Sequence, residues 1–364
     1  MIRHCSLLSE LLLALVDIDE DGSGDDLPAV ASRHRSNAYT FSIPLHIIMP
    51  AISVVAIEIC QSLAECLNKN GPAIVAPDHL QLICQQTMLV LEGKSPAQID
   101  ADADADEDAA EEGSEYESVL ISAASDLVGA LATVLGGDFV EPMKQFMPAL
   151  AKYYAPGRSA SDRATVAGTL GEIIVGMKEN VTLFTNDFLS LLSRAIADED
   201  APVRSNACFA TGVLVENSKQ DLSAHFPALL NALRPMFEKR QSEVGDEQNA
   251  TDNAVGCAAR LVSTKPEAVP LDQVLPVIFS CLPLRKDFAE WAPVLHALIS
   301  LVQANNGVAI SHLDTILQLF SHVLGQGDDV LGSQLRGQCV GFVSALNVRV
   351  PDKIQAAGLQ QHLV

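Results

Sequence analysis

The sequence predicts an all-α solenoid of stacked helical pairs, and three observations support that fold class. A helical unit recurs about every 41 to 47 residues, the length of a helical-hairpin repeat. Aromatic residues make up only 5% of the chain, Ala, Leu and Glu are abundant, and alternating β-type runs are absent. The 364 residues also exceed what one globular core normally supports, whereas a repeat packs only on its neighbours.

The clearest copy of the repeat runs from Asp187 to Asn217. Its first helix has one apolar stripe, formed by Phe188, Leu189, Leu191, Leu192 and Ile196. Asp200 is placed to cap the second helix, and Pro202 suits the first turn because an N–H there has no helical partner. The pattern is typical of HEAT repeats, in which an Asp of the turn pairs with an Arg of the second helix. Here those residues are Asp198 and Arg204.

The same positions recur along the chain. Three segments align on their helices, with Asp252-Asn253 and the turn 294–296 between them: Arg163-Ala164-Thr165, Arg204-Ser205-Asn206 and Arg336-Gly337-Gln338. Equivalent positions of a solenoid stack into columns, so this series predicts a ladder of polar side chains on a concave face that binds elongated partners. The chain length predicts about seven or eight hairpins.

An acidic run divides the chain. Residues 100–117 hold ten carboxylates and no basic residue, and such dense like charges predict a solvated, disordered loop over 99–117. Upstream, 1–98 is expected to contain helical repeats, with an irregular insert near 17–45 and a hairpin of helices 54–68 and 78–91. Downstream, 118–364 is expected to be a HEAT-repeat array. Its helices besides the second helix of the 187–217 copy are expected at 119–135, 139–154, 162–177, 183–197, 222–239, 248–262, 271–281, 289–303, 310–324 and 332–346.

Metal and membrane sites are not predicted. The eight cysteines form no Cys-x-x-Cys pair and the histidines are scattered, so we expect buried free thiols and no zinc. Asp17 to Gly22 resembles the start of an EF-hand loop, but Pro28 stands where the twelfth-position Glu should be, which favours a linker over a calcium site. The apolar stretches 7–16 and 47–59 are too short to cross a bilayer and fit buried helices instead.

Catalytic motifs are also lacking. The chain has no Walker loop, no Gly-x-Ser-x-Gly elbow and no His-Glu-x-x-His helix. Gly168 and Gly171 fit helix packing better than phosphate binding, because no strand precedes them. We therefore expect neither an enzyme nor a cofactor.

Charge indicates the class of partner. The chain has 23 basic and 46 acidic residues, a net charge of −23, and removing the ten carboxylates of the acidic run still leaves −13. Nucleic acid is disfavoured because phosphate contacts need basic side chains. An acidic surface favours basic proteins. The alternative, that the acidic surface only keeps a large helical protein soluble, stays open.

Several ordered blocks carry a family resemblance over roughly residues 50 to 350. They are Tyr116–Leu131, Leu170–Ile174, Asp200–Ala207, Asp252–Arg260 and Leu282–Phe288. In these blocks the chain resembles the C-terminal half of importin-β-type nuclear transport receptors (karyopherin-β proteins), in the importin-4-like branch. Residues 17–45 match nothing in that family.

The resemblance implies a receptor that shuttles between cytoplasm and nucleus across the nuclear envelope. Its cargo would be basic proteins such as histones and ribosomal proteins. The small GTPase Ran and nuclear pore proteins would be partners of the full-length receptor. The repeats that grip Ran lie in the half without a counterpart here, so the chain is expected to be a fragment that does not release cargo with Ran by itself. The runner-up is a HEAT-repeat scaffold subunit of a multiprotein complex.

The resemblance also implies a cargo site. Asn206 and Asn253 would hold the cargo backbone, because one amide can donate to a C=O and accept from an N–H. Capping or inter-repeat hydrogen bonds are the alternative for both. Three carboxylates would accept lysines, and one indole would pack on a lysine stem; these residues are Asp252, Asp287, Glu290 and Trp291. For Asp287 and Glu290 a solvated turn is the alternative.

Overall fold

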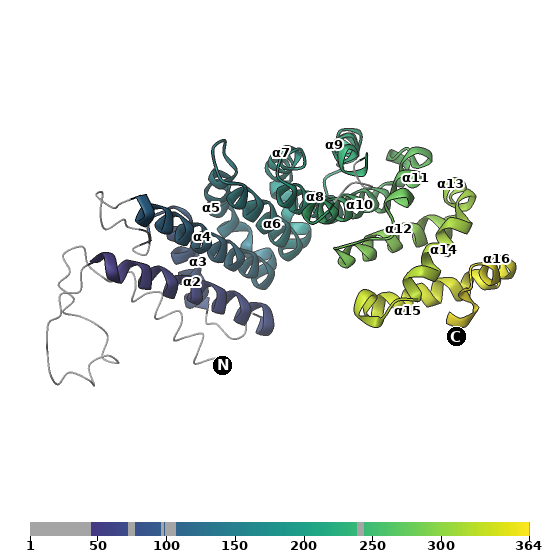
Figure 1. Ribbon diagram of the computed structural model, residues 1–364, viewed down its shortest axis with the longest axis horizontal. Helices are drawn as coiled ribbons and strands as arrows, with labels where there is room; N and C mark the ends of the chain where they lie inside the picture. Colours follow the sequence, from purple (N-terminus) through teal and green to yellow (C-terminus); the bar gives the residue numbers. More distant parts are fainter. Residues whose placement is uncertain (1–44, 72–76, 96–97, 99–106, 239–243, 364) are drawn as a thin grey trace. The chain divides into compact units, whose positions relative to one another are not determined.

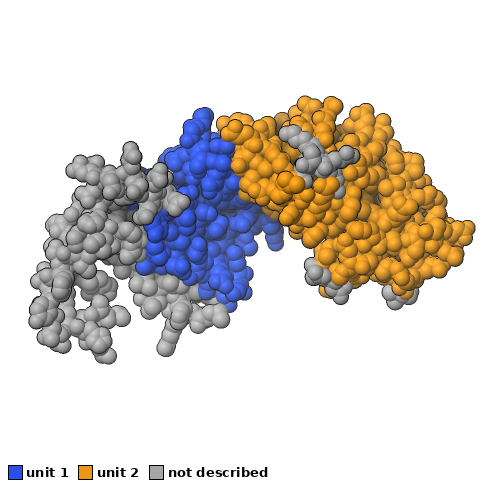
Figure 2. Space-filling view, in the orientation of Figure 1, with its two compact units in different colours: residues 1–180 blue, residues 181–364 orange. Residues whose placement is uncertain are grey.

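The computed structural model describes residues 45–71, 77–95, 98, 107–238 and 244–363, and these residues form α-helices and short 3-10 helices with no strand. The all-α fold class is therefore confirmed. Contacts divide the chain into unit 1, Met1–Asn180, and unit 2, Val181–Val364 (Figure 2).

Unit 1 has two layers of helices. Three helices lie side by side and are called its B layer: α2 (Leu45–Asn70), α4 (Glu107–Leu135) and α6 (Ala160–Met177). The other two pack on one side of them and are called its A layer: α3 (Pro77–Leu91) and α5 (Val140–Ala151) (Figure 1). No described helix covers the face of the B layer that points away from α3 and α5, and this face is called the open side.

Unit 2 repeats this arrangement. Its B layer consists of α8 (Ala201–Asn217), α10 (Asp246–Thr264), α12 (Trp291–Gln303) and α15 (Asp328–Asn347). Its A layer consists of α7 (Thr185–Ala195), α9 (Phe226–Glu238), α11 (Leu271–Cys281) and α14 (Leu313–Leu324). The short helices α13 (Gly307–Ser311) and α16 (Pro351–Ala356) complete the unit. Within α15, Gly332 is non-helical, with φ 67° and ψ 158°. The regular helix therefore begins after Gly332, which agrees with the helix predicted at 332–346.

The local signals of the 187–217 repeat are confirmed. The Asp200 carboxylate caps α8 by accepting from the Val203 N–H at 3.2 Å, and Pro202 lies in the first turn. Ser159 caps α6 in the same way, accepting from the Asp162 N–H at 3.0 Å. These caps satisfy backbone donors that have no helical partner and so fix where each second helix starts.

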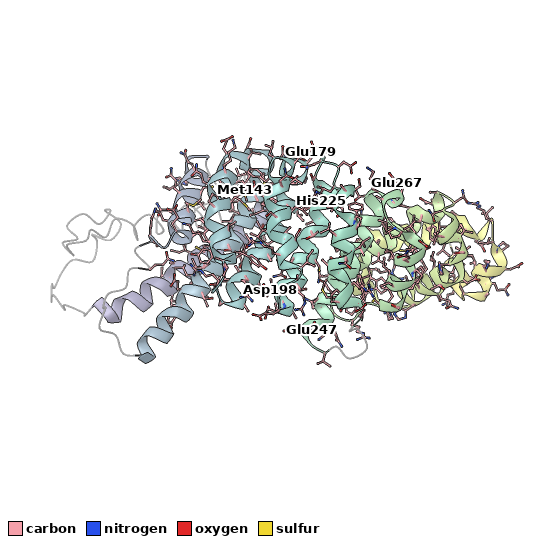
Figure 3. The ribbon with its side chains drawn as sticks, turned by 90° about the horizontal axis from the view of Figure 1, so that it is seen from above. Met143, Glu179, Asp198, His225, Glu247 and Glu267 are labelled. Atoms are coloured by element: carbon pink, nitrogen blue, oxygen red, sulfur yellow. The ribbon has the colours of Figure 1, made fainter. Side chains whose placement is uncertain are left out.

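The repeated arginines have a shared structural role. Arg163 donates to the Arg158 carbonyl at 2.8 Å, and Arg204 donates to the carbonyls of Asp198 and Glu199 at 2.8 and 2.7 Å. Arg336 likewise donates to the carbonyls of Leu324 and Gln326. Each guanidinium thus binds main-chain oxygens just before its own helix. Arg204 also reaches Glu247 of the next repeat at 2.6 Å, on the edge of unit 2 that carries Asp198 and Glu247 in Figure 3.

Two expectations about the acidic run are corrected. Residues 107–117 belong to α4, so only 99–106 of the predicted acidic loop lies outside the described residues. The helix α3 pairs with α4, not with α2 as the hairpin prediction had it, and both sides of the run belong to unit 1. The acidic run therefore lies in the connection between α3 and α4, two helices that pack against each other.

The thiols are mostly as expected. Six cysteines of the described residues have no disulfide bond: Cys60, Cys84, Cys208, Cys257, Cys281 and Cys339. Burial raises the pKa of Cys60 to about 12 and of Cys257 to about 12, so both stay protonated and act as small apolar groups. Cys66 carries a disulfide bond, which departs from the expectation of free thiols throughout.

Close packing of α4 on α6 depends on Gly176. A Cβ atom at this position would lie 2.5 Å from the Thr133 backbone nitrogen, so the two helices can approach only without a side chain here. We expect Gly176→Ala to lower the free energy of unfolding by about 1–3 kcal/mol, measured by denaturant unfolding. The matched control is Gly341→Ala, because no atom lies within 4 Å of a Cβ there. That change is expected to leave stability equal or higher, since Ala favours a helix.

Candidate functional site

The helix α10 lies at the centre of the cargo site predicted in unit 2, and it is enclosed. Every residue from Ala250 to Val262 is buried. Its neighbours are α8 and α12 within the B layer, α9 and α11 in the A layer, and the 3-10 helix η9 (Phe288–Glu290). The part of α10 that carries the predicted site residues thus has no face open to solvent.

Asn253 uses its side-chain amide inside this layer. It donates to Ser205 Oγ at 3.1 Å, to the Asn249 carbonyl at 3.1 Å and to Asp287 Oδ2 at 3.0 Å. Only 3% of the residue is exposed. The inter-repeat hydrogen bond, which the sequence left open as the alternative role, is therefore what the structure shows.

Asp252 holds the chain segment between α11 and α12. One oxygen, Oδ2, accepts from the backbone N–H groups of Arg285, Lys286 and Asp287 at 2.8, 2.6 and 3.1 Å. The residue is fully buried. Three converging donors stabilise a buried carboxylate and at the same time fix the conformation of the turn.

Glu290 and Arg260 form a buried ion pair. Arg260 Nη2 donates to Glu290 Oε1 at 3.2 Å and Nη1 contacts Oε2, while Arg260 Nε donates to Glu216 on α8 at 3.1 Å. Burial raises the pKa of the Glu290 carboxyl, and the guanidinium opposes that shift. Gly256 makes the space, because a Cβ atom there would collide with the Glu290 carboxylate. Arg260 of α10 thus links α8 to η9, the turn that leads into α12.

These contacts correct part of the predicted site. Asp252, Asn253, Glu290 and Trp291 are buried, with Trp291 fully enclosed, so a cargo peptide has no access to them. The tertiary environment of α10, not visible in a local pattern, is the reason. Of the six predicted residues, only Asn206 and Asp287 are half-exposed. Asp287 also caps its own turn, accepting from the Ala289 N–H at 3.2 Å.

A different surface, on unit 1, carries carboxylates that are exposed. We call it the acidic face and define it by four residues on the open side of the B layer: Glu58 and Glu65 on α2, Asp126 on α4 and Glu172 on α6. Helix α4 has seven carboxylates and no basic residue. Lys69, the one lysine of α2, is at its C-terminal end and forms an ion pair with Glu65. The face is therefore strongly negative.

Asp126 and Glu172 form the centre of the acidic face. The Glu172 carboxylate lies directly over Gly129 of α4, where a Cβ atom would collide with it. Removal from water and then repulsion from Asp126 raise the pKa of Glu172 to about 6, and removal from water also raises the pKa of Asp126. Both shifts mean that the ionised carboxylates lack compensation from positive charge. Such a pair favours the arrival of a cation.

Apolar side chains accompany these carboxylates. Exposed valines occur on the same three helices: Val54 and Val55 on α2, Val119 on α4 and Val175 on α6, each between 42% and 48% exposed. A lysine or arginine bound to the carboxylates could lay its aliphatic stem on such groups. The sequence reasoning missed this surface, although Asp126 and Glu172 are 46 residues apart, within the range of the repeat length.

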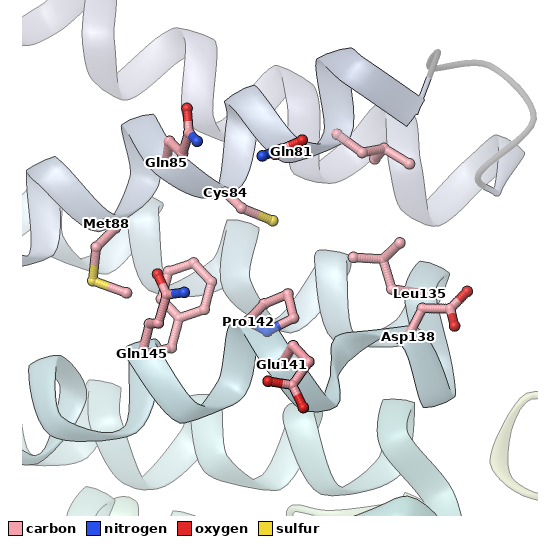
Figure 4. A pocket seen from close by; sticks show the side chains of 11 residues that line it. Gln81, Cys84, Gln85, Met88, Leu135, Asp138, Glu141, Pro142 and Gln145 are labelled. Atoms are coloured by element: carbon pink, nitrogen blue, oxygen red, sulfur yellow. The ribbon is translucent and has the colours of Figure 1, made fainter.

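A cavity opens between the A-layer helices α3 and α5 of unit 1. It has a volume of about 430 Å³. Figure 4 shows Gln81, Cys84, Gln85 and Met88 of α3 on one side of it, and Pro142 and Gln145 of α5 on the other. The apolar lining suits a small apolar side chain, and the glutamine amides can bond to a peptide backbone.

The other site classes give no candidate in the described part of the chain. Among the described residues, no cluster of three or more His, Cys, Asp or Glu side chains is arranged to hold a metal ion. The calcium-loop motif at 17–28 lies outside the described residues. One helical stretch, Tyr116–Tyr154, is apolar and long enough to cross a membrane, with 61% of its apolar window buried inside the protein. A core helix passes the same test, so this is weak evidence for a membrane span.

Comparisons with known proteins agree with the fold. A family model described as "Stalled ribosome sensor GCN1-like, HEAT repeats" matches residues 121–275. Two solved structures of Kap121p are similar at 14% identity. The complex with Nup53p has a TM-score of 0.53 and covers 86% of this chain and 30% of Kap121p. The complex with the SUMO protease Ulp1p has a TM-score of 0.54 and covers 98% and 33%.

Curated relatives are importins. The probable importin subunit beta-4 of Schizosaccharomyces pombe is 36% identical over 233 residues, 64% of this chain and 21% of that protein. Importin-4 of Homo sapiens is 30% identical over 305 residues, 83% of this chain and 27% of that protein. The chain thus spans about a quarter of the length of these relatives. With its HEAT-type helical pairs and these relatives, the chain belongs to the importin-β (karyopherin) family.

Proposed function

We propose that this chain is part of a nuclear import receptor, and that it binds basic segments of its cargo on the acidic face of unit 1. The observation that carries the proposal is the Asp126–Glu172 pair, two exposed carboxylates whose pKa values are raised and which face each other across adjacent B-layer helices. Importin relatives support the transport role. The role is one of binding and release, without covalent chemistry.

The acidic face is electrostatically unfavourable before cargo binds. Two neighbouring carboxylates repel each other, and the surrounding protein reduces the compensation that water provides. A lysine or arginine placed between them replaces repulsion with attraction and can also donate hydrogen bonds to both. A negative surface further increases the rate at which a basic segment arrives. Basic proteins with extended Lys-rich segments, such as histones and ribosomal proteins, are therefore the proposed cargo.

Other partners follow from the family. Kap121p has been solved in complex with RanGTP, with Nup53p and with the C-terminus of the phosphatase Cdc14p. We propose that Ran and nuclear pore proteins likewise bind the full-length receptor to which this chain belongs. Such a receptor shuttles between cytoplasm and nucleus.

Asn206 is retained as a proposed cargo contact in unit 2. It is half-exposed on α8, on the same helical stripe as Phe209 and Glu216, which are also accessible. The Asn206 amide can hold a peptide backbone, whereas Phe209 and Glu216 already contact the Arg260 guanidinium. Asp287 is not proposed as a lysine acceptor, since its two carboxylate oxygens already accept hydrogen bonds from the Asn253 amide and the Ala289 N–H.

A charge-removal experiment tests the cargo proposal. We expect the double change Asp126→Asn with Glu172→Gln to weaken binding of a fluorescent, lysine-rich histone-tail peptide about tenfold, equivalent to about 1.4 kcal/mol. The affinity of the unchanged protein should fall steeply with added salt, because exposed charges are screened. Fluorescence anisotropy titrations at two salt concentrations measure both effects.

The matched control removes the same charge from the other layer. Asp138→Asn with Glu141→Gln takes two exposed carboxylates from the α5 side of unit 1 and should change the affinity less than twofold. Equal losses in the two double variants would show that only net charge matters. If the unchanged protein does not bind the peptide at all, the result agrees with the scaffold alternative and contradicts the import proposal.

The raised pKa of Glu172 predicts pH-dependent binding. Its pKa in the folded protein is about 6, above the ordinary 4.5, so ionised Glu172 opposes folding and this penalty disappears as the pH falls through 6. A bound lysine lowers that pKa. Peptide affinity should therefore decrease between about pH 7.5 and about pH 5.5, as measured by anisotropy. Glu172→Gln should have a weaker affinity and a flatter pH profile; an unchanged profile in that variant would contradict the assignment.

A further inference from the structure

The segment that joins α11 to α12 has an inner side and an outer side. Leu284 is buried, Asp252 and Asn253 hold the backbone and the Asp287 side chain from below, and Glu290 is anchored by Arg260. We call residues 284–290 the anchored turn. Its conformation is thus fixed at three points by α10, a helix that is itself buried.

The outer side of the anchored turn presents a basic and aromatic surface. Arg285, Lys286 and Ala289 are exposed. Phe288 is 40% exposed, and it is the one phenylalanine of the described part of the chain that is classed as exposed. The acidic groups of this region face inward: Asp252 and Asp287 accept hydrogen bonds from the turn and α10, and Glu290 pairs with Arg260. Positive charge therefore points out and negative charge points in.

We infer that the anchored turn is a docking surface for an acidic protein segment that carries an aromatic residue. A carboxylate of the segment would pair with Lys286, and its aromatic ring would pack on Phe288. The fixed backbone keeps the ordering cost of binding low, because the turn has already lost its conformational freedom. In a chain with a net charge of −23, a local basic surface selects acidic partners, which the acidic face of unit 1 repels.

This site is separate from the proposed cargo site. The anchored turn lies in unit 2, the acidic face lies in unit 1, and the two favour ligands of opposite charge. A lysine-rich peptide should therefore not compete with an acidic peptide. The inference stands or fails independently of the import proposal.

The test uses the full chain and a labelled synthetic peptide of Asp and Glu with one central Phe. We expect Lys286→Glu to weaken peptide binding at least about tenfold and Phe288→Ala to weaken it about fivefold. A peptide in which Ser replaces Phe should bind the unchanged protein about fivefold less tightly as well. Lys219→Glu, at an exposed position elsewhere in unit 2, and Val348→Ala, at an 86% exposed position, are the control variants and should change affinity less than twofold.

A third variant separates a fixed turn from simple charge attraction. Asp252→Asn removes a negative charge, so a purely electrostatic surface would bind the acidic peptide more tightly. It also weakens the acceptor for three backbone N–H groups, so an anchored turn should bind about threefold to tenfold less tightly. Circular dichroism checks that this variant is folded. The inference is overturned if the peptide shows no saturable binding. It is also overturned if the Lys286→Glu and Phe288→Ala variants bind the peptide as tightly as the unchanged protein does.

Discussion

Glu290→Gln is expected to lower the free energy of unfolding by about 3 kcal/mol or more, one of the two largest effects in this chain. Removing the charge leaves the Arg260 guanidinium buried with only Glu216 to balance it, and Glu216 is 40% exposed. An uncompensated buried charge is far more destabilising than the loss of a surface ion pair. Denaturant unfolding followed by circular dichroism measures the change.

Glu216 supplies the matched control for that prediction. It contacts the same guanidinium from α8 at 3.1 Å, but from the solvent side. Glu216→Gln should therefore reduce stability by no more than about 1 kcal/mol. If the two variants lost the same stability, the Glu290 carboxylate would not be the buried partner that compensates Arg260.

Trp291→Ala is expected to destabilise the protein by about 3–5 kcal/mol. The indole is fully enclosed at the start of α12, and its removal leaves a cavity that the surrounding helices cannot close completely. Thermal or denaturant unfolding detects a change of this size directly. Peptide affinity, measured at a temperature where the variant is still folded, should be unchanged because the indole does not reach the surface.

The control at this position is Trp291→Phe. Its Nε1 has no hydrogen-bond partner within the described residues, so exchanging indole for phenyl removes volume without breaking a polar contact. A loss of about 1 kcal/mol or less is expected. A phenylalanine variant as unstable as the alanine variant would indicate that the indole N–H, and not the volume of the ring, holds this site together.

The fold could be predicted from the sequence because its signals are local. The Asp200 cap, the proline at 202 and the apolar stripe of α7 depend on residues within one turn or one helix of each other. The pairing of α3 with α4 depended instead on contacts across the acidic run. A high density of like charges indicates that a segment cannot be buried. It does not indicate which of the flanking helices pack together, or that residues 107–117 form part of α4.

The site was harder to predict, for a physical reason. Asn253 and Asn206 occupy similar positions in their repeats, yet the turn between α11 and α12 covers one and leaves the other half-exposed. One signal was available: Arg260 and Glu216 are 44 residues apart, in phase with the repeat, which indicates an ion pair between adjacent helices. The same spacing argument would also have brought Asp126 and Glu172 together.

Cross-linking from a bound peptide identifies the surface of the chain that holds a basic segment. A lysine-rich peptide with a photoreactive group at its centre is bound to the full chain at low salt, irradiated, and the linked residues are identified by mass spectrometry. We expect cross-links on the open side of α2, α4 and α6, near Glu58, Asp126 and Glu172, and we expect them to disappear when excess unlabelled peptide is present. Cross-links confined to α3 and α5, or to unit 2, would contradict this expectation.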